Sequence, residues 1–408
     1  MGQYQSYKDS GTEWLGKIPS HWKVNRIASY FTERKTKVSD KDYAPLSVTK
    51  MGILPQLENV AKTDDGDNRK LVKENDFVIN SRSDRRGSSG VSSLDGSVSL
   101  INIVLEPKPG ISPGYCNYLL KSYAFIEEFY RNGHGIVADL WTTRYDEMKT
   151  IKICIPTYQE QERISSYLDA ATAKIDEVIA QQQRMINLLN ERKKIVINHA
   201  VTKGFNPNVK YKETGIAWIG AIPEHWQLMQ LRYTATNHDN LRQPITADQR
   251  DRNDPQYDYY GASGVIDRID HYNVDDKVLL IGEDGANLVL RNLPLVYKAE
   301  GKFWVNNHAH ILKPRGNDYD FMALVLEAAD YTLFITGSAQ PKLSQANMNA
   351  VKLPIPPIEE QREIVAGIKP KLEKIDSFIE QHSSMVSFLQ ERKQIIINDV
   401  VTGKVKVF

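Results

Sequence analysis

A tryptophan-rich motif occurs twice in this chain. Residues 7–27 read YKDSGTEWLGKIPSHWKVNRI, and residues 211–231 read YKETGIAWIGAIPEHWQLMQL, 204 positions later. Nine of the 21 positions are identical, including both tryptophans of each copy: Trp14 and Trp22, Trp218 and Trp226. A repeat of this length indicates that the architecture itself is duplicated.

A second, longer repeat follows each copy of the motif. Residues 155–204 and 355–404 share 20 of 50 positions, beginning IPTYQEQERI and IPPIEEQREI. Between the repeats, residues 28–154 and 232–354 share little beyond their size. Because connecting segments are usually the variable part of a protein, this inverted pattern favours a symmetric scaffold holding two different readers over neutral drift of a tandem domain.

The long repeats predict two helices, at residues 160–199 and 360–399. Apolar residues recur there at spacings of four and three, typical of a coiled-coil seam. Forty helical residues span about 60 Å. Each helix has one apolar stripe and needs a partner, so we expect antiparallel packing, with the N-terminal motif near the end of the second helix. The predicted seam residues are Ile164, Leu168, Ala171, Ile175, Val178, Met185, Leu189 and Val196, then Ile364, Ile368, Ile375, Phe378, Met385, Leu389 and Ile396.

Two polar positions interrupt the predicted seam in both copies, Gln182 with His382 and Arg192 with Arg392. Polar seam residues can fix the register of a helix pair; a partner protein or solvent facing them is an equally good explanation. Pro370 stands inside the second helix, where the first has Ala170. Proline removes a helical hydrogen bond, so a kink or break is expected there.

The two variable regions are predicted to be mixed, mostly β units. Glycine, asparagine and aspartate punctuate the strand-like runs. The fold class is therefore α+β: two globular units and two long antiparallel helices, with a circular, pseudo-two-fold internal repeat. Strands are expected at 76–80, 97–105, 278–281 and 308–312, and short helices at 116–129 and 319–331. The predicted domains are 1–155, 156–206, 207–354 and 355–408.

Composition narrows the classes of protein. The 408 residues exceed the roughly 250–300 that one core usually reaches. Lysine and arginine number 52 against 51 acidic residues, so a nucleic-acid surface must come from local clustering of charge. Only Cys116 and Cys154 are present, and neither a signal peptide nor a membrane-length apolar run is visible. We therefore expect a cytoplasmic protein without a membrane partner.

Catalytic patterns are weak. Glu300-Gly301-Lys302 with Asp284, and Glu106-Pro107-Lys108 with Asp95, imitate metal-dependent nucleases, but such triplets arise by chance in a highly charged chain. Residues 254–257 read DPQY, near the DPPY of amino-methyltransferases, without a glycine-rich cofactor loop. His308 and His310 could suggest a metal, yet no ligand partners stand at suitable spacing. We expect neither a catalytic site, nor a metal, nor a cofactor in this chain.

One segment does point to nucleic acid. Residues 80–90, NSRSDRRGSSG, place three arginines among small residues. Guanidinium forks pair with phosphate or with guanine; a solvated surface loop is the alternative. The candidate DNA-binding residues of the first half are Lys50, Ser81, Arg82, Arg85, Arg86, Ser88, His134 and Arg144. Those of the second half are Arg242, Gln243, Ser263, Asn287, Arg291, His308, Gln340 and Lys342, with Arg250 and Arg252 nearby.

These motifs resemble the specificity subunit of type I restriction–modification enzymes. The resemblance rests on SGxxWxGxIPxHW (10–22, and 214–226 with Thr214), on IPxxxEQxxI (155–164 and 355–364), and on a closing VTxG (201–204, shortened at 401–403). Stretches such as YYGASGVIDRI, LLIGEDGANL and FWVNNHAHILKP are similar to that family's target recognition domains. The resemblance covers essentially the whole chain.

The resemblance implies a non-catalytic subunit whose two recognition domains, set apart by the helices, each read one half of a bipartite, asymmetric double-stranded DNA site. Two methyltransferase subunits would dock on the scaffold, with Gln182, Arg192, His382 and Arg392 as candidate contacts. Motor–nuclease subunits would join them. S-adenosylmethionine, ATP and Mg²⁺ would belong to these partners. Two alternatives stay open: a coiled-coil adaptor of another defence complex, and a self-sufficient nuclease.

Overall fold

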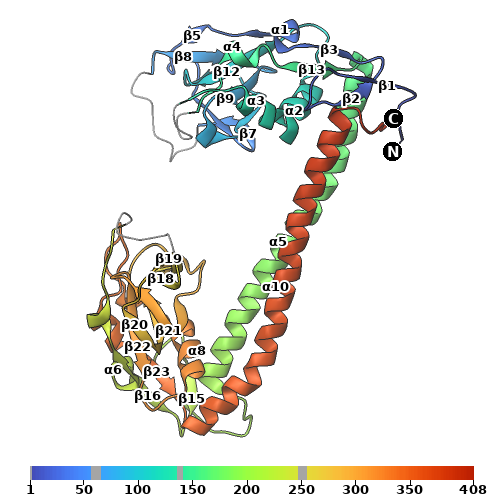
Figure 1. Ribbon diagram of the computed structural model, residues 1–408. Coiled ribbons are helices and arrows are strands. Elements are labelled where there is room, and N and C mark those ends of the chain that lie inside the picture. The colour runs from blue at the N-terminus through green and yellow to red at the C-terminus, as the bar shows by residue number, and fades with distance from the viewer. Residues whose placement is uncertain (1, 57–65, 136–140, 247–254) are drawn as a thin grey trace. The chain divides into compact units, whose positions relative to one another are not determined.

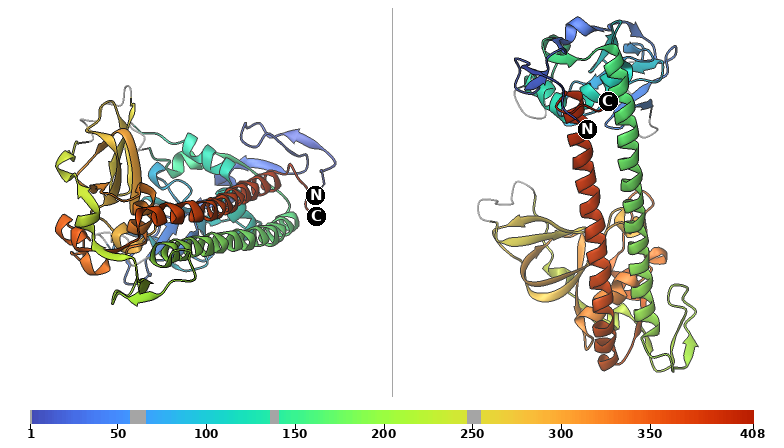
Figure 2. Two further views of the ribbon diagram at one scale, coloured as in Figure 1. Left: turned by 90° about the horizontal axis from the view of Figure 1, so that it is seen from below. Right: turned by 90° about the vertical axis from the view of Figure 1, so that its right-hand side faces the viewer.

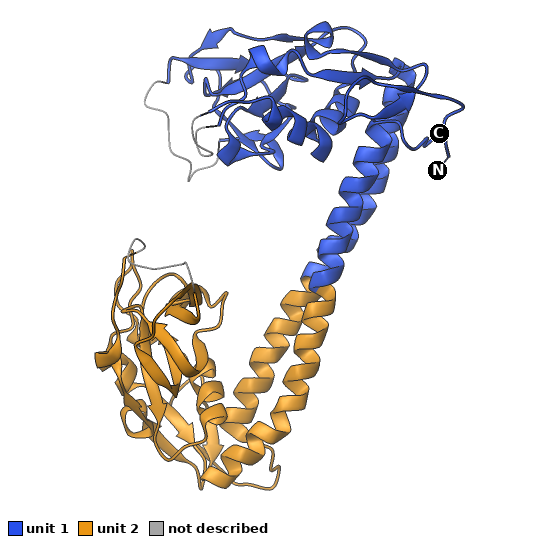
Figure 3. Cartoon of the chain, in the orientation of Figure 1, with its two compact units in different colours: residues 1–183, 383–408 blue, residues 184–382 orange. Residues whose placement is uncertain are grey.

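The computed structural model describes residues 2–56, 66–135, 141–246 and 255–408. The chain forms two compact units (Figure 3). Unit 1 comprises Met1–Gln183 and Ser383–Phe408, and unit 2 comprises Arg184–His382. Each unit combines sheets and short helices with part of both long helices, α5 (Tyr158–Lys203) and α10 (Ile358–Val401) (Figure 1). The predicted α+β class is confirmed.

Unit 1 is built on a four-stranded sheet ordered β10-β9-β12-β4 and a three-stranded sheet ordered β11-β8-β5. The strands are β1 (Tyr7–Asp9), β2 (Lys17–Pro19), β3 (Lys23–Arg26), β4 (Phe31–Glu33), β5 (Lys37–Val38), β6 (Leu46–Thr49), β7 (Gly52–Pro55), β8 (Arg69–Val72), β9 (Phe77–Asn80), β10 (Ser89–Val91), β11 (Gly96–Val98), β12 (Asn102–Pro107) and β13 (Lys152–Ile155). The short helices are α1 (Ile27–Tyr30), η1 (Ser83–Arg85), α2 (Pro113–Lys121), α3 (Tyr123–Arg131) and α4 (Tyr145–Met148). The helix expected at 116–129 is two helices, because Ser122 ends α2 and caps α3.

Unit 2 is built on a six-stranded sheet ordered β17-β22-β20-β21-β18-β19. The strands are β14 (Tyr211–Glu213), β15 (Ala221–Pro223), β16 (Gln227–Gln230), β17 (Ala235–Asn237), β18 (Tyr257–Gly261), β19 (Gly264–Ile269), β20 (Val274–Gly282), β21 (Val296–Val305), β22 (Ala309–Pro314) and β23 (Lys352–Ile355). The short helices are α6 (Leu231–Thr234), η3 (Asp239–Leu241), α7 (Asn287–Leu290), α8 (Tyr319–Ala328), η5 (Thr332–Phe334) and α9 (Gln345–Ala350).

The long helices pack antiparallel within each unit, as predicted (Figures 1 and 2). In unit 1 Lys393 of α10 bonds Asp176 of α5 at 2.6 Å, and in unit 2 Lys193 of α5 bonds Asp376 of α10 at 2.5 Å. Both pairs of residue numbers sum to 569, as one antiparallel register requires. The same arrangement is therefore built twice with the two helices exchanged.

The predicted seam is wrong by one residue at four places. Val178 and Met185 are 38% and 43% exposed, and Phe378 and Met385 are 41% and 47% exposed. The residues that follow them, Ile179, Ile186, Ile379 and Val386, are half-buried in the seam instead. Two apolar residues stand side by side at each place, so spacing alone could not choose between them.

Of the four polar residues predicted to lie in the seam, two do so and two do not. Gln182 and His382 are half-buried, as expected, but Arg192 and Arg392 are exposed. Lys193 and Lys393 occupy the seam there, where each can reach an aspartate of the other helix. A break at Pro370 is also wrong, since α10 continues through this residue.

The tryptophan-rich motif caps the helix pair in each unit. Trp22 and Trp226 are fully buried. Trp226 packs beside Gly204, directly after α5, and Trp22 packs beside Gly403, two residues after the end of α10. The chain ends meet in unit 1, where Gly2 and Lys406 exchange two backbone hydrogen bonds of 2.9 Å (Figure 2). The predicted closure of the N-terminal motif onto the end of the second helix is confirmed.

The repeated Glu-Gln pair joins each long helix to its unit. Glu160 bonds His21 at 2.8 Å, and Glu360 bonds His225 at 2.8 Å. The neighbouring Gln161 and Gln361 are both 1% exposed. Their side-chain carbonyls accept hydrogen bonds of 2.8 Å from the backbone N–H groups of Ser112 and Asp318, the N-caps of α2 and α8. Each long helix thus fixes one short helix of its unit, α2 in unit 1 and α8 in unit 2.

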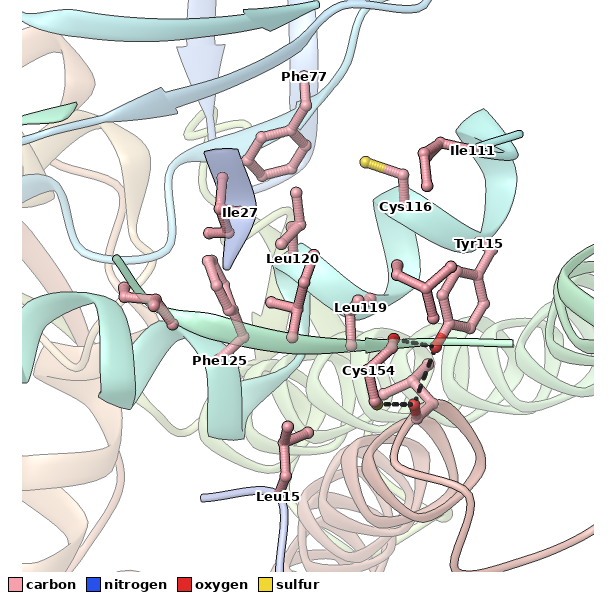
Figure 4. Close-up of a cluster of buried hydrophobic side chains, with 14 of the residues drawn as sticks. Leu15, Ile27, Phe77, Ile111, Tyr115, Cys116, Leu119, Leu120, Phe125 and Cys154 are labelled. Atoms are coloured by element: carbon pink, nitrogen blue, oxygen red, sulfur yellow. Dashed lines mark hydrogen bonds between the residues drawn. The ribbon is translucent and has the colours of Figure 1, made fainter. Parts of the chain in front are cut away.

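In the core of unit 1, one buried side chain joins α2 to strand β13 and to the end of α10. Tyr115 of α2 is fully buried, and its hydroxyl lies 3.1 Å from the carbonyl oxygens of both Cys154 and Val401 (Figure 4). Strand β13 and the end of α10 therefore meet at one side chain. Among the described helices, none is long and apolar enough to cross a membrane.

Candidate nucleic-acid interface

Two loops of unit 1 meet at the end of strand β9. One is the β9 loop (residues 81–88), and the other is the α4 loop (residues 134–142), whose residues 136–140 are not described. Thr142 forms antiparallel bridges with both Arg82 and His134, and the N–H of Thr143 donates to the carbonyl of Ser81 at 3.0 Å. The structure thus brings together three residues that the sequence analysis selected separately: Ser81, Arg82 and His134.

Two loops of unit 2 meet in the same way at the end of β20. They are the β20 loop (residues 283–286) and the α9 loop (residues 336–342). Lys342 forms antiparallel bridges with Asp284 and Thr336, and the N–H of Leu343 donates to the carbonyl of Glu283 at 2.7 Å. The two units therefore repeat one loop geometry, which their sequences do not reveal.

The strands beneath the loops repeat as well. Ile103 of β12 pairs with Ile79 of β9, and His310 of β22 pairs with Ile281 of β20. Counting from these pairs, the side chains that occupy equivalent places differ in chemistry: Ser81 against Glu283, Arg82 against Asp284, and Ile103 against His310. One backbone arrangement carries two different sets of side chains.

The β9 loop presents its arginines in different ways. Arg82 is exposed and the side chain of Arg85 is 69% exposed, whereas Arg86 pairs with Glu127 and lies 5.3 Å over the ring of Tyr130. The Tyr130 hydroxyl lies 3.1 Å from the carbonyl oxygens of Asn80 and Arg82, and burial raises its pKa to about 12. The hydroxyl of Tyr130 thereby fixes the loop backbone.

A hollow of about 440 Å³ opens beside this loop, and the sequence analysis missed it. Ser81 and Ser88, predicted as DNA contacts, are buried at 6% exposure each, so they support the loop from within. The hollow is lined by Ser83, Arg86, Glu127, Tyr130, Arg131 and Trp141.

Three predicted basic residues of unit 2 converge on two carboxylates. Arg242 pairs with Glu283, whose other oxygen lies 3.1 Å from Lys342 Nζ. His308 bonds Asp284 at 2.7 Å. Burial acts to raise the pKa of Glu283, but hydrogen bonds from Arg242 and Lys342 outweigh it and hold that pKa below its usual value. The sequence analysis missed Glu283; its place directly after a buried strand was the available signal.

Several other predicted residues lie outside these loops. Lys50 is in the turn between β6 and β7, Ser263 in the turn between β18 and β19, and Arg144 at the N-cap of α4. Gln243 is exposed just after η3. Gln340, by contrast, is exposed on the α9 loop itself.

Two predicted residues of unit 2 are engaged within the protein. The amide of Asn287 bonds the backbone of Leu293 at 2.9 and 3.2 Å, and Arg291 bonds Glu327. The residues Arg250 and Arg252, and Asp254 of the DPQY stretch, fall outside the described residues.

The carboxylates of the nuclease-like patterns each have a separate basic partner. Asp95 bonds Lys73 at 2.6 Å, Glu106 bonds Arg34 at 3.1 Å, and Glu300 bonds Lys277 at 3.0 Å. Within the described part of the chain, histidine, cysteine, aspartate and glutamate form no group suited to a metal ion. The loop pairs, rather than these patterns, are the candidate site.

Comparison with known proteins finds one family similar to this chain. The family described as "Type I restriction modification DNA specificity domain" matches residues 223–382. The putative specificity subunit of the MjaX type I restriction enzyme of Methanocaldococcus jannaschii is 22% identical over 99% of this chain and 98% of that protein. The chain is thus similar to a type I specificity subunit along nearly its whole length.

A second relative and one solved structure are similar as well. The putative type I specificity subunit S.HindORF215P of Haemophilus influenzae is 34% identical, over 31% of this chain and 32% of that protein. The fold is similar to that of a chain solved in work on complex assembly and conformational transition of the type I R-M system, with a TM-score of 0.66 at 14% identity, covering 95% of this chain and 99% of that one. Specificity subunits are non-catalytic parts of their enzymes, which agrees with the expectation from sequence.

Proposed function

We propose that this chain is a type I specificity subunit that reads a bipartite, asymmetric DNA site, with the loop pair of each unit contacting one half. The observation that carries this proposal is the repeated loop geometry with unlike side chains. Equivalent loops present arginine in unit 1 and a carboxylate–histidine–lysine set in unit 2. Hydrogen-bonding side chains of different type select different base edges, so the two halves of the site differ.

We further propose that the helix pair docks two methyltransferase subunits. Eight exposed apolar residues each directly precede a seam residue, so on each helix they share one face beside the seam. Four lie in unit 1: Val178, Met385, Phe388 and Ile395. Four lie in unit 2: Phe378, Met185, Leu188 and Ile195. We name these sets stripe 1 and stripe 2.

The two stripes are equivalent to each other through the 200-residue offset of the repeat. Contiguous exposed apolar residues mark interaction sites, and two equivalent sites suit two copies of one partner. The exposed residues Arg392 and Arg192 also directly precede seam residues. They would add one charged contact to each stripe. Motor–nuclease subunits would then assemble on this core, and the partners would supply S-adenosylmethionine, ATP and Mg²⁺.

Exchange of one variable region tests the reading model. Residues 28–154 would be replaced by the equivalent region of a relative, and methylated adenines would be mapped genome-wide in cells that also express the methyltransferase partner. One half of the methylated site should change while the other half is retained, because base contacts are local and roughly additive. The gap between the halves should not move, because both helices are unchanged.

A complementary exchange of residues 232–354 is the matched control, since it should alter only the other half-site. Simultaneous change of both halves in either chimera would contradict independent reading by the two units. A changed gap with unaltered helices would contradict the role of the helices in setting that gap.

A further inference from the structure

The basic side chains in the loop pair of unit 2 are already bound to carboxylates of the same unit. Arg242 pairs with Glu283, and Lys342 Nζ lies 3.1 Å from the other oxygen of that carboxylate. The Glu283 side chain is only 8% exposed, and a nearly buried charge is costly when a partner is taken from it. His308 is bound through Nδ1 to Asp284 at 2.7 Å, which leaves one ring nitrogen for any other contact.

Two glutamines flank these bound cations along the chain. Gln243 directly follows Arg242, and Gln340 lies two residues before Lys342. Both glutamines are exposed, and within the described part of the chain neither side-chain amide bonds to another residue. Because Arg242 and Lys342 reach the same carboxylate, that of Glu283, the two free amides border one site.

The backbone of Gln243 is fixed on both sides, although its side chain is free. Its N–H donates to the carbonyl of Val305 at 3.1 Å, and its carbonyl accepts from Trp304 Nε1 at 2.7 Å. Trp304 is 5% exposed and packs in a cluster with Tyr259 and Ile269. A side chain that reads a ligand needs a rigid support, and strand β21 provides one for Gln243.

The backbone of Gln340 is held in a closed loop. Thr336 and Lys342 exchange two backbone hydrogen bonds, of 2.9 and 2.8 Å, across the base of this loop. Gly337 has a φ of 82°, and a Cβ at this position would lie 2.5 Å from the carbonyl oxygen of Gln340. Only glycine therefore allows the loop to turn back so closely on Gln340, whose side chain stays exposed.

A free carboxamide carries the donor and the acceptor that match adenine. In the major groove adenine presents the N7 acceptor beside the N6 amino donor, and one glutamine can bind both. Two other polar side chains of the loop pair are less selective, because the exposed Ser338 hydroxyl can contact different bases and His308 offers one nitrogen. Unit 1 differs, since its exposed Arg82 and Arg85 suit guanine or phosphate.

We propose that Gln243 and Gln340 read adenines in the second half of the DNA site, while Arg242 and Lys342 hold the two loops in place. The inference rests on the proposed function and names the base that unit 2 selects. An amide bound to a base edge neutralises no phosphate. Loss of either amide should therefore relax specificity at one position and leave the dependence of affinity on salt unchanged.

The test uses the full chain in complex with its methyltransferase partner and the duplex site found by methylation mapping. Each adenine of the second half-site, apart from the methylated one, is replaced in turn by 7-deazaadenine, which lacks the N7 acceptor but keeps its base pairing. Fluorescence anisotropy should show about a tenfold loss of affinity at two positions, because a bidentate contact is broken there. Substitution of 7-deazaguanine in the first half-site is the internal control.

Two variants assign each contact to its residue. Gln243→Ala and Gln340→Ala should each bind the natural site about tenfold more weakly, and each should become indifferent to 7-deazaadenine at one position, because the contact is already lost. The response to 7-deazaguanine in the first half-site should not change. Gln227→Ala, which alters an exposed glutamine on β16 of the same unit, is the matched control.

Full affinity with 7-deazaadenine at every second-half position would overturn the proposal, and so would a variant of either glutamine that keeps all the wild-type losses. A uniform loss on all sequences with a lower salt slope would also overturn it, because a phosphate contact behaves in that way. Should either variant fail to fold, the base-analogue series on the wild type decides alone. A complex that does not discriminate against a scrambled second half-site is a separate result, because it would overturn the proposed function itself.

Discussion

The arginine side chains of the β9 loop differ in their contacts with the rest of the protein. Arg82 and Arg85 project from the loop, whereas Arg86 is held by Glu127 and Tyr130. We expect the double substitution Arg82→Ala and Arg85→Ala to weaken DNA binding with little change in stability. Losing a base contact costs about 1–3 kcal/mol and relaxes one position, whereas losing a phosphate contact lowers the salt slope by about one.

The measurement is DNA affinity of the methyltransferase complex at several salt concentrations, with thermal unfolding in parallel. Arg362→Ala is the control, since Arg362 lies on α10 outside both loop pairs. Unchanged affinity and salt slope in the double variant would show that the β9 loop does not touch DNA.

The two thiols should be chemically silent in the folded chain. Cys116 and Cys154 are free and buried, and burial raises the pKa of Cys154 to about 12. The thiolate is the reactive form, so neither thiol should react with a disulfide reagent at about pH 8 until the chain unfolds. Rapid titration of either thiol in native buffer would show that unit 1 opens more readily than its core implies.

At the scale of the helices, one lysine in the seam of each unit forms an ion pair with an aspartate of the other helix. Asp176→Lys should place two positive charges beside one another in unit 1 and lower the free energy of unfolding. The loss should be about 1 kcal/mol, because the aspartate is 54% exposed. The double variant Asp176→Lys with Lys393→Asp should recover most of that loss. Thermal unfolding measures both, and absence of recovery would contradict a direct bond.

Stripe 1 gives a second prediction for the helices. Phe388→Glu with Ile395→Glu should reduce the methyltransferase bound per chain from two copies to one, because stripe 2 remains intact. Native mass spectrometry of the co-expressed complex counts the copies. Gln390→Glu, on another face of the same helix, is the matched control. Two copies retained by the stripe variant would place docking elsewhere.

Prediction from sequence succeeded where a repeat or a period supplied the signal. The antiparallel helices and the closure of the chain ends followed from motif order and spacing. It failed where the signal was ambiguous, as at Val178 and Ile179, two apolar neighbours of which only packing selects one. The shared loop geometry of the two units was hidden because it rests on backbone hydrogen bonds, such as those of Thr143 and Leu343, which many sequences can make.

At the scale of the whole molecule, the units are not successive halves of the chain. Unit 1 contains the last residues, Ser383–Phe408, whereas unit 2 is one continuous segment. Truncation before residue 383 should therefore damage the first unit and spare the second. Limited proteolysis of this truncated chain, followed by mass spectrometry, should find cleavage around Trp22 and protection of residues 211–355. The opposite pattern would contradict the division into these two units.

Because unit 1 is built from both ends of the chain, it cannot finish folding until the chain has been fully synthesised. Residues 1–183 leave the exit tunnel first, yet the cluster that buries Trp22 and Tyr115 is completed by residues at the end of α10, such as Val400 and Val401. At about 5–20 residues per second, roughly 10–40 s pass between synthesis of the two parts. Unit 1, whose first residues are translated first, can therefore finish folding only at the end of synthesis. Until then its exposed apolar surface must be covered by chaperones or by α5.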